Sequence, residues 1–115
     1  MRKFELEHRV AYVETDAMAI VHHSNYIRWF EMGRNDMLRT IGYPYSKLEK
    51  MGIWMPVIGV ACDYKSPAVF DEVVLIRAWV DKVKGASVYL AYEVVGKESG
   101  EVKVTGSSSH GVTDT

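Results

Sequence analysis

The stretch SNYIRWFEMGRNDMLRTIG, residues 24–42, decides the fold of this chain. Its apolar positions recur every three or four residues, as they do in an amphipathic helix that buries one face. These positions are Tyr26, Phe30, Gly33, Met37 and Ile41, with Ile27 and Leu38 beside them. We expect Ser24 to cap the start of the helix and Gly42 to end it in the left-handed conformation. The sequence therefore predicts one long helix.

The segment before this helix alternates apolar and polar side chains over residues 4–12. The apolar side holds Phe4, Leu6, His8, Val10 and Tyr12, and the other side holds Glu5, Glu7, Arg9 and Ala11. A period of two is typical of a half-buried β-strand. The alternation fails from Glu14 to His23, so we expect a loop between the strand and the helix.

The segment after the helix is predicted to form a short helix and then only strands. Ser46 and Glu49 have the spacing of a capping box for the short helix, which Gly52 would end. The predicted strands cover residues 53–65, 72–84, 87–97 and 101–112, with turns at Gly85 and at Ser99-Gly100. One strand, one long helix and four antiparallel strands predict a single α+β domain over residues 1–115, with the helix on one face of the sheet.

Several predicted strands are apolar on both faces, which is unusual for an antiparallel sheet with one wet side. These runs are residues 57–62, 73–76 and 78–80. A single helix covers only one face, so we expect a second copy of the chain to cover the other face or a sheet edge. The alternative is that Val and Ile are present for their strand propensity alone.

The composition limits the partners of this 115-residue chain. Its formal net charge of -1 argues against nucleic acid, because phosphate binding needs clustered Lys and Arg. The most apolar run, residues 53–62, is far shorter than the ~20 residues of a membrane span. A single cysteine permits no internal disulfide, and the N-terminus lacks an apolar signal segment. We expect a cytoplasmic protein.

One carboxylate, Asp16, lies in the loop shortly before the long helix. Helix N-termini present unpaired N–H groups and a partial positive charge, which can hold a carbonyl oxygen that becomes negative during acyl transfer. A nearby carboxylate can attack the carbonyl carbon or activate a water molecule that does so. A helix cap or a surface charge has the same spacing, so the pattern alone leaves both interpretations open.

Three motifs around this carboxylate resemble those of a known enzyme family. They are Thr15-Asp16-Ala17, Val21-His22-His23-Ser24-Asn25-Tyr26 and Trp29-Phe30-Glu31. The chain resembles the 4-hydroxybenzoyl-CoA thioesterase family, and within it the branch of short acyl-CoA thioesterases found beside the bacterial Tol-Pal genes. Residues 62–68 and 70–72 agree, so the likeness covers nearly the whole chain. It implies the hot-dog fold, a five-stranded antiparallel sheet wrapped around one long helix, in homodimers or homotetramers with active sites between subunits.

The resemblance also implies a reaction: hydrolysis of an acyl-CoA thioester to CoA and a carboxylic acid, with no metal or other cofactor. It assigns the catalytic carboxylate, as nucleophile or general base, to Asp16. It assigns to His23 the backbone N–H that polarises the thioester carbonyl. Asn25 and Tyr26 match the remaining substrate-site positions, where Asn25 supports the loop and Tyr26 anchors the helix in the core.

One departure from the family pattern follows the carboxylate. Many relatives have glycine where this chain has Met18-Ala19. Glycine permits unusual backbone angles and a close approach of the ligand. A narrower acyl pocket or a different loop path would follow, so the sequence leaves the acyl group open.

Two other functions are compatible with the same fold. A non-catalytic module would bind acyl-CoA or an acyl-carrier protein without releasing thiol, although the retained Asp16 speaks against it. A hot-dog dehydratase would carry a different, histidine-containing helix signature.

The remaining reactive side chains are given structural roles. The histidines His8, His22, His23 and His110 lack the carboxylate or cysteine cluster of a metal site, and we expect the adjacent pair to point apart on an extended loop. Cys62 is expected to pack in a strand, and Glu31 and Arg34 to form an exposed ion pair. Candidates for a basic rim that binds the CoA phosphates are Lys65, Arg77, Lys82 and Lys84.

Overall fold

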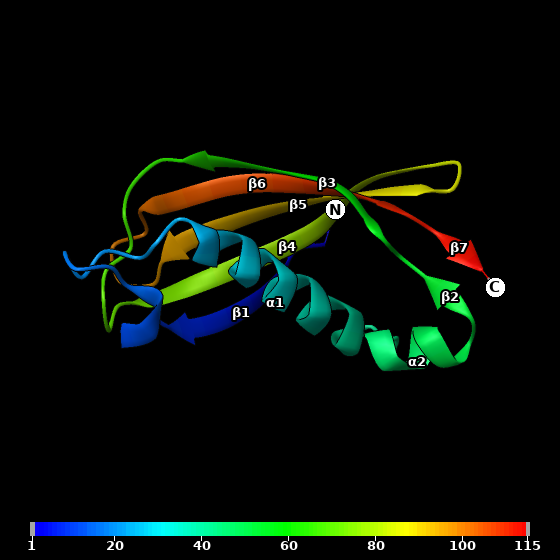
Figure 1. The fold of residues 1–115 in the computed structure, drawn as a ribbon, viewed down its shortest axis with the longest axis horizontal. Coiled ribbons are helices and arrows are strands. Elements are labelled where there is room, and N and C mark those ends of the chain that lie inside the picture. The colour runs from blue at the N-terminus through cyan, green and yellow to red at the C-terminus, as the bar shows by residue number, and fades with distance from the viewer. Residues whose placement is uncertain (1, 115) are drawn as a thin grey trace.

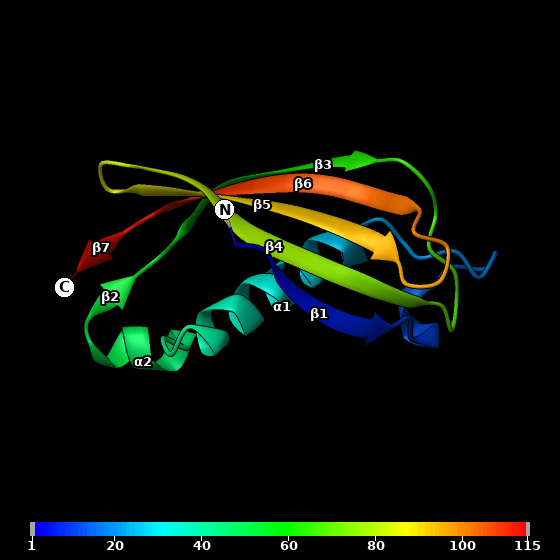
Figure 2. The same cartoon turned by 180° about the vertical axis from the view of Figure 1, so that it is seen from behind.

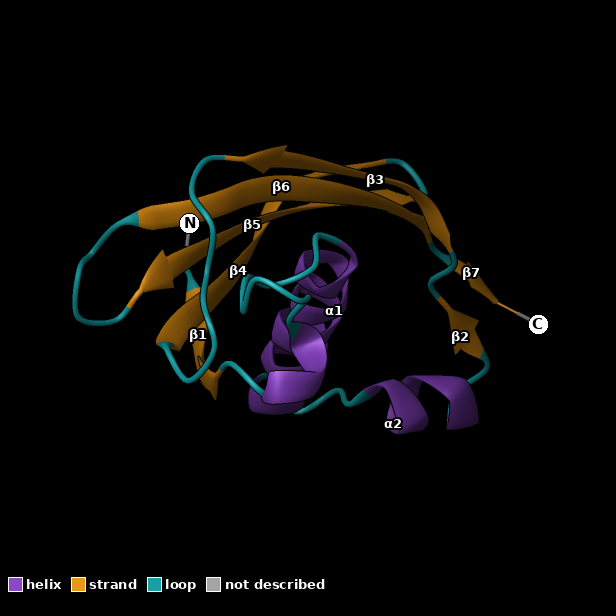
Figure 3. Cartoon of the chain, turned by 60° about the vertical axis from the view of Figure 1, so that its left-hand side comes forward, coloured by secondary structure: helices purple, strands orange, loops and turns teal. Residues whose placement is uncertain are grey.

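The computed structural model describes residues 2–114 of the chain (Figure 1). Its elements are β1 (Phe4–Arg9), a 3-10 turn (Tyr12–Glu14), α1 (Ser24–Thr40), α2 (Tyr45–Lys50), β2 (Ile53–Trp54), β3 (Val57–Tyr64), β4 (Val73–Lys84), β5 (Ser87–Gly96), β6 (Val102–Gly111) and β7 (Thr113–Asp114). Five strands form one antiparallel sheet in the order β1-β4-β5-β6-β3, and it curls around α1 (Figure 3). The predicted α+β hot-dog arrangement is confirmed.

The short strands β2 and β7 pair with each other outside the main sheet. Seen from behind, this ribbon and the β4–β5 hairpin lie at one end of the molecule, and the loop that precedes α1 lies at the other end (Figure 2). The N-terminus of α1 is therefore at the end of the sheet away from α2. Within residues 2–114, no helix has both the length and the apolar character needed to cross a bilayer.

The helix α1 packs closely on the concave face of the sheet because two glycines leave room for it. Phe30 is 2% exposed and stacks on Tyr92, with ring centroids 4.5 Å apart. Beneath it, a Cβ added at Gly106 would lie 2.6 Å from Cζ of Phe30, and a Cβ added at Gly33 would lie 2.9 Å from Cγ2 of Ile76. Interiors packed at crystal density do not absorb such added volume easily. The two glycines therefore set the distance between helix and sheet.

The ends of α1 agree with the sequence only in part. Gly42 has φ +90° just past the helix, as predicted. The predicted Ser24 cap is wrong: the cap residue is His23, whose backbone is helical and whose side chain caps nothing. The Ser24 N–H instead donates to Nδ1 of His22 at 3.3 Å, because the preceding ring folds over the first turn.

The capping box predicted for α2 is also wrong. The helix follows Pro44, which has φ -57°, and no side chain caps its first turn. Pro44 holds the cap position with an extended backbone (ψ 153°), and its carbonyl accepts the first helical hydrogen bonds, from Lys47 and Leu48. Gly52 has φ +76° after the last turn, as predicted for the residue that ends this helix.

Three predicted strands end earlier than expected. The strand predicted over 53–65 breaks at Pro56, because proline has no N–H to give to a ladder. The strand predicted over 101–112 ends at Gly111, and the chain continues into the separate ribbon. The first strand ends at Arg9, and Tyr12 is 74% exposed although the alternation placed it on the core side. The chain turns there because the N–H of Val10 bonds Glu72 and a 3-10 turn follows.

The apolar side chains on the two faces of the sheet differ in how deeply they are buried. On β4, Val74 and Ile76 are fully buried under α1, while Val73 and Leu75 on the opposite face are half-buried. The edge strand β3 exposes several apolar side chains: Val57 55%, Ile58 67%, Val60 45% and Tyr64 49%. The other edge strand, β1, instead exposes charged side chains.

Candidate functional site

The segment predicted as a loop before α1 is a small hairpin. The carbonyl of Glu14 accepts the N–H of His22 at 2.9 Å, Thr15 bridges to Val21, and the N–H of Asp16 donates to the carbonyl of Ile20 at 2.9 Å. A tight turn closes it, because the N–H of Ala19 donates to the carbonyl of Asp16 at 3.0 Å. We call residues 14–22 the Asp16 hairpin. Backbone hydrogen bonds fix the path of the chain on both sides of the carboxylate.

The carboxylate of Asp16 is exposed and is held by one of its two oxygens. Oδ1 accepts the N–H of Met18 at 2.8 Å and the N–H of Ile20 at 3.4 Å. Within residues 2–114, no donor reaches Oδ2. An oriented carboxylate with one free oxygen can take a proton from water or attack an electrophilic carbon.

The tip of the hairpin is where this chain has Met18-Ala19 in place of the glycine of many relatives. Ala19 has φ +61°, a left-handed conformation that costs an alanine about 1–2 kcal/mol. The chain therefore adopts the backbone angle that a glycine permits. Alanine at this position therefore strains the loop.

We expect Ala19→Gly to stabilise the protein by roughly 0.5 kcal/mol, because relief of this strain exceeds the extra entropy of glycine in the unfolded chain. Thermal unfolding should show a midpoint about 2 °C higher. The control is Ala17→Gly in the same turn, where φ is not positive and the substitution should not stabilise. An equal gain for both variants would contradict the assignment of strain to position 19.

The start of α1 presents an amide next to two stacked imidazoles. His23 has φ -58° and ψ -26°, and within residues 2–114 no acceptor takes its backbone N–H. The rings of His22 and His23 stack with centroids 4.3 Å apart. The expectation that they point apart is wrong, because His23 has already entered the helical conformation.

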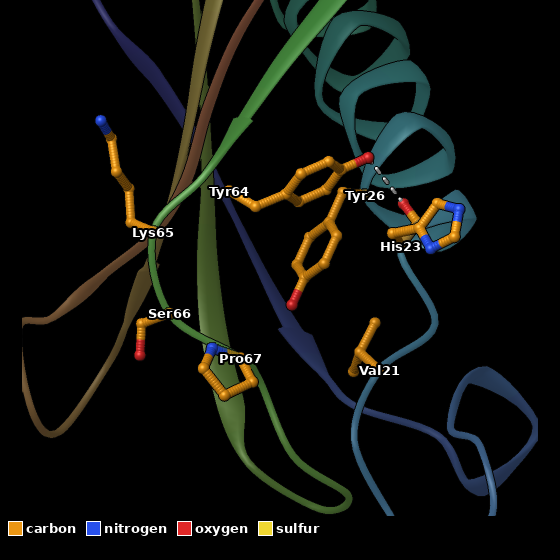
Figure 4. Close-up of a pocket in the computed structure, with 7 residues that line it drawn as sticks. All are labelled: Val21, His23, Tyr26, Tyr64, Lys65, Ser66 and Pro67. Atoms are coloured by element: carbon orange, nitrogen blue, oxygen red, sulfur yellow. Dashed lines mark hydrogen bonds between the residues drawn. The ribbon is translucent and has the colours of Figure 1, made fainter.

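An open pocket of about 310 Å³ lies beside this helix start (Figure 4). It is lined by Val21, His23, Tyr26, Tyr64, Lys65, Ser66 and Pro67. The hydroxyl of Tyr64, on the edge strand, donates to the carbonyl of His23 at 3.4 Å. The pocket therefore lies where the end of β3 meets the first turn of the helix.

Tyr26 forms the inner wall of this pocket and is 3% exposed. Its hydroxyl oxygen accepts the N–H of Ala68 at 3.0 Å. Burial raises the pKa of Tyr26, although the hydrogen bond from Ala68 opposes the shift. The phenol is therefore neutral, and it anchors α1 to the loop after β3.

The structure brings together only two of the four predicted site residues. His23 and Tyr26 line one pocket, whereas Asp16 and Asn25 are not among the residues that line it. Asn25 is buried, and its Nδ2 donates to the carbonyl of Glu14 at 2.9 Å, at the base of the Asp16 hairpin. Asn25 thus holds the hairpin and does not face the pocket.

Glu14 is a residue of this region that sequence reasoning missed. Its carboxylate accepts hydrogen bonds from the indole of Trp29 and the N–H of Ala11, and it pairs with His8. Burial pushes the pKa of Glu14 upward, but the bonds from Ala11, Trp29 and His8 outweigh burial and lower it. The carboxylate is charged inside the protein. No helix or strand period marks it, because its bonds to Ala11, His8 and Trp29 form only once the chain turns after β1 and α1 packs against that strand.

The basic side chains proposed for a CoA rim differ in their placement. Lys65 lines the pocket, although its ammonium also pairs with Asp63 at 2.6 Å. Arg77 is tied to two glutamates on the sheet, and Lys82 lies over the ring of Tyr89 at 4.7 Å. Of these side chains only Lys65 belongs to a residue that lines the pocket, and Figure 4 shows its ammonium directed away from His23 and Tyr26.

Two further expectations concern side chains near the pocket. Burial raises the pKa of Cys62, so its thiol is protonated, as expected for a packing residue. The predicted ion pair of Glu31 and Arg34 is wrong for the described residues, where both instead line a groove between α1 and β3. No three His, Cys, Asp or Glu side chains within residues 2–114 are grouped to hold a metal ion.

Known proteins resemble this chain over most of its length. A family model described as "Thioesterase superfamily" matches residues 18–103. YneP of Bacillus subtilis, provisionally named an acyl-CoA thioesterase, is 35% identical over 108 residues, which span 94% of this chain and 76% of YneP. The acyl-CoA thioesterase YbgC of Haemophilus influenzae is 34% identical over 86 residues, 74% of this chain and 63% of YbgC.

Solved structures also resemble this chain over most of its length. A DHNA-CoA thioesterase from Staphylococcus aureus superposes with a TM-score of 0.91 at 32% identity, and the match covers 99% of this chain and 76% of that one. The likeness therefore extends to the arrangement of helix and sheet.

Proposed function

The chain belongs to the thioesterase superfamily, and from that premise we propose that it hydrolyses acyl-CoA to CoA and a carboxylic acid, with Asp16 and the backbone N–H of His23 as the reacting groups. The observation that carries this proposal is a hairpin that leads from Asp16 directly into the start of α1, where, among residues 2–114, neither Oδ2 of Asp16 nor the N–H of His23 has a hydrogen-bond partner. The motifs around Asp16 favour the 4-hydroxybenzoyl-CoA thioesterase family and its Tol-Pal branch.

The chemistry follows from these two groups. The thioester carbonyl oxygen accepts the N–H of His23, and the charge that develops on this oxygen is stabilised by that amide and by the helix N-terminus. Asp16 either removes a proton from the attacking water or attacks the carbonyl carbon and forms an anhydride that water then hydrolyses. In both routes the carbon–sulfur bond breaks, CoA leaves as a thiolate that takes up a proton, and the acid is released.

In this proposal Asp16 and the amide of His23 come from one chain, and a second copy of the chain closes the open pocket beside them. The edge strand β3 leaves one row of backbone groups and the side chains of Val57, Ile58 and Val60 exposed. An exposed, apolar sheet edge is a template for pairing with another chain. Pairing there brings the pocket at Tyr64 against the second copy. We therefore propose a homodimer, or a homotetramer built from it.

We expect Ile58→Lys to give a monomer, because a charged side chain on an edge strand blocks pairing of sheets. Ile58 is 67% exposed in the single chain, so the fold itself should persist. Light scattering coupled to size exclusion at micromolar protein would measure the mass. Val83→Lys, at an equally exposed valine on the β4–β5 hairpin, is the matched control. An unchanged mass of the Ile58 variant would contradict association through β3.

The experiment that tests the function is thiol release across short, long and aromatic acyl-CoAs. Aromatic substrates belong in the panel because the matched S. aureus structure is named for the aromatic DHNA-CoA. We expect stoichiometric CoA and free acid from at least one class. Tight acyl-CoA binding without thiol release would instead support a non-catalytic binding module, and an enoyl product would support a dehydratase.

A further inference from the structure

The carboxylate of Glu14 joins three elements of the fold. It accepts the indole N–H of Trp29 at 2.6 Å and the backbone N–H of Ala11 at 2.7 Å, and its Oε1 lies 2.9 Å from Nε2 of His8. Trp29 belongs to α1 and His8 to β1, and Ala11 directly precedes the 3-10 turn. The side chain is 13% exposed, so its orientation is fixed by protein donors.

The main chain of the same residue holds the base of the Asp16 hairpin. The carbonyl of Glu14 accepts the N–H of His22 at 2.9 Å and Nδ2 of Asn25 at 2.9 Å. Asp16 leaves this base along one arm of the hairpin, and His23 follows directly after the other arm. Glu14 therefore acts as a clamp: its hydrogen bonds hold the base of the hairpin, from which one arm leads to Asp16 and the other leads to His23.

We infer that Glu14 is a positioning residue for thioester hydrolysis: its bond to Trp29 fixes the Asp16 hairpin relative to α1, and so fixes Asp16 relative to the amide of His23. This inference rests on the proposed function. Trp29 is fully buried one turn beyond the helix start and cannot move with the loop. Because the indole is immobile, the hairpin takes its orientation from the body of the helix.

The geometry of this clamp matters more for turnover than for binding. Misplacement of a reacting group by about 1 Å can lower a rate by the order of 100-fold. The pocket itself is lined by other residues, none of which bonds the Glu14 carboxylate. Loosening the clamp should therefore affect kcat and leave KM nearly unchanged.

Two variants loosen the clamp in different ways. Glu14→Gln keeps the size of the side chain but has only one acceptor oxygen, whereas both carboxylate oxygens of Glu14 accept hydrogen bonds in the wild type. Trp29→Phe removes the N–H and keeps a ring in the core. We expect each to lower kcat roughly 10- to 100-fold, with KM and CoA affinity within about 3-fold of wild type. The double variant should be no slower than the slower single variant, because both break the same link.

The matched control is Glu7→Gln on β1, an exposed glutamate that pairs with Lys97 at the surface. It should leave kcat unchanged. All rates are compared well below the unfolding midpoint of each variant, so that loss of folded protein does not contribute. Partial rescue by Gln relative to Glu14→Ala would support a role through the hydrogen bond.

The outcomes separate this inference from the proposed function. Wild-type kcat in a folded Glu14→Gln or Trp29→Phe protein overturns the inference alone, as does an additive double variant. If Glu14→Gln fails to fold, Trp29→Phe decides by the same criterion. A wild-type protein that releases no thiol from any acyl-CoA overturns the proposed function and the inference together.

Discussion

We expect Asp16→Asn to lower thiol release by the order of 100-fold or more, because an amide can neither accept the proton of the attacking water nor serve as a nucleophile in its place. The variant should remain folded. Asparagine keeps the oxygen that accepts the N–H of Met18, so the Asp16 hairpin retains its turn. The measurements are kcat by thiol release and affinity for an unhydrolysed acyl-CoA, which should change little.

The control for this variant is Asp71→Asn. Asp71 is an exposed aspartate with φ +68°, a conformation that asparagine also tolerates, and it lies in a nearby loop. The same change of charge there should leave turnover intact. Turnover by Asp16→Asn within about 3-fold of wild type would remove the role assigned to that carboxylate, since general-base catalysis contributes about 100- to 10,000-fold.

The second large effect concerns stability. We expect Gly106→Ala to destabilise the fold by about 3 kcal/mol or more, because the added Cβ overpacks the seat of α1. It would lie 2.6 Å from Cζ of Phe30 and 2.7 Å from the carbonyl oxygen of Ala61. Neither neighbour can yield easily, since Phe30 is stacked on Tyr92 and Ala61 is held by the sheet. Urea unfolding measures the loss.

Gly111→Ala on the same strand is the matched control. Its added Cβ would meet Ile58 at 3.6 Å and Pro56 at 3.8 Å, which are ordinary contacts. We expect a change within about 0.5 kcal/mol there. If the two variants were equally stable, the absence of a side chain at Gly106 would not be required for the close packing of α1 on β6.

The elements that could be predicted from the sequence are those whose cause is local. The repeat from Tyr26 to Ile41 predicted a helix because every third or fourth side chain must face the core. The alternation over residues 4–12 predicted β1 for the same kind of reason. Gly42 and Gly52 were identifiable because left-handed backbone angles favour glycine.

The parts that could not be predicted depend on how the chain turns and how its elements pack together. Glu14 is an unremarkable acid until the fold brings Trp29 and His8 to it. The strand predicted over 53–65 did not anticipate the break at Pro56, nor the pairing of residues 53–54 with residues 113–114. The stacking of His22 on His23 depends on where α1 begins, and a single sequence fixes helix ends poorly.

The candidate site divides in the same way. A carboxylate followed by a helix start could be read directly from residues 12–31. That Oδ1 of Asp16 is occupied by the amides of Met18 and Ile20 while Oδ2 is free could not, because it depends on the turn that the backbone adopts. Tyr64 joined the pocket only through the curl of β3 over the helix.

The two edge strands of the five-stranded sheet, β1 and β3, differ in the side chains they expose. This difference bears on how far the proposed assembly could grow. The edge strand β1 exposes the charged side chains Glu5 and Glu7, which pair with Arg77 and Lys97 over the outer face of the sheet. The edge strand β3 instead exposes apolar side chains, among them Val57, Ile58 and Val60. In the proposed dimer, β3 of one molecule would pair with β3 of the other in an isologous contact that uses this edge of both. Strand addition through β3 would then stop at two copies.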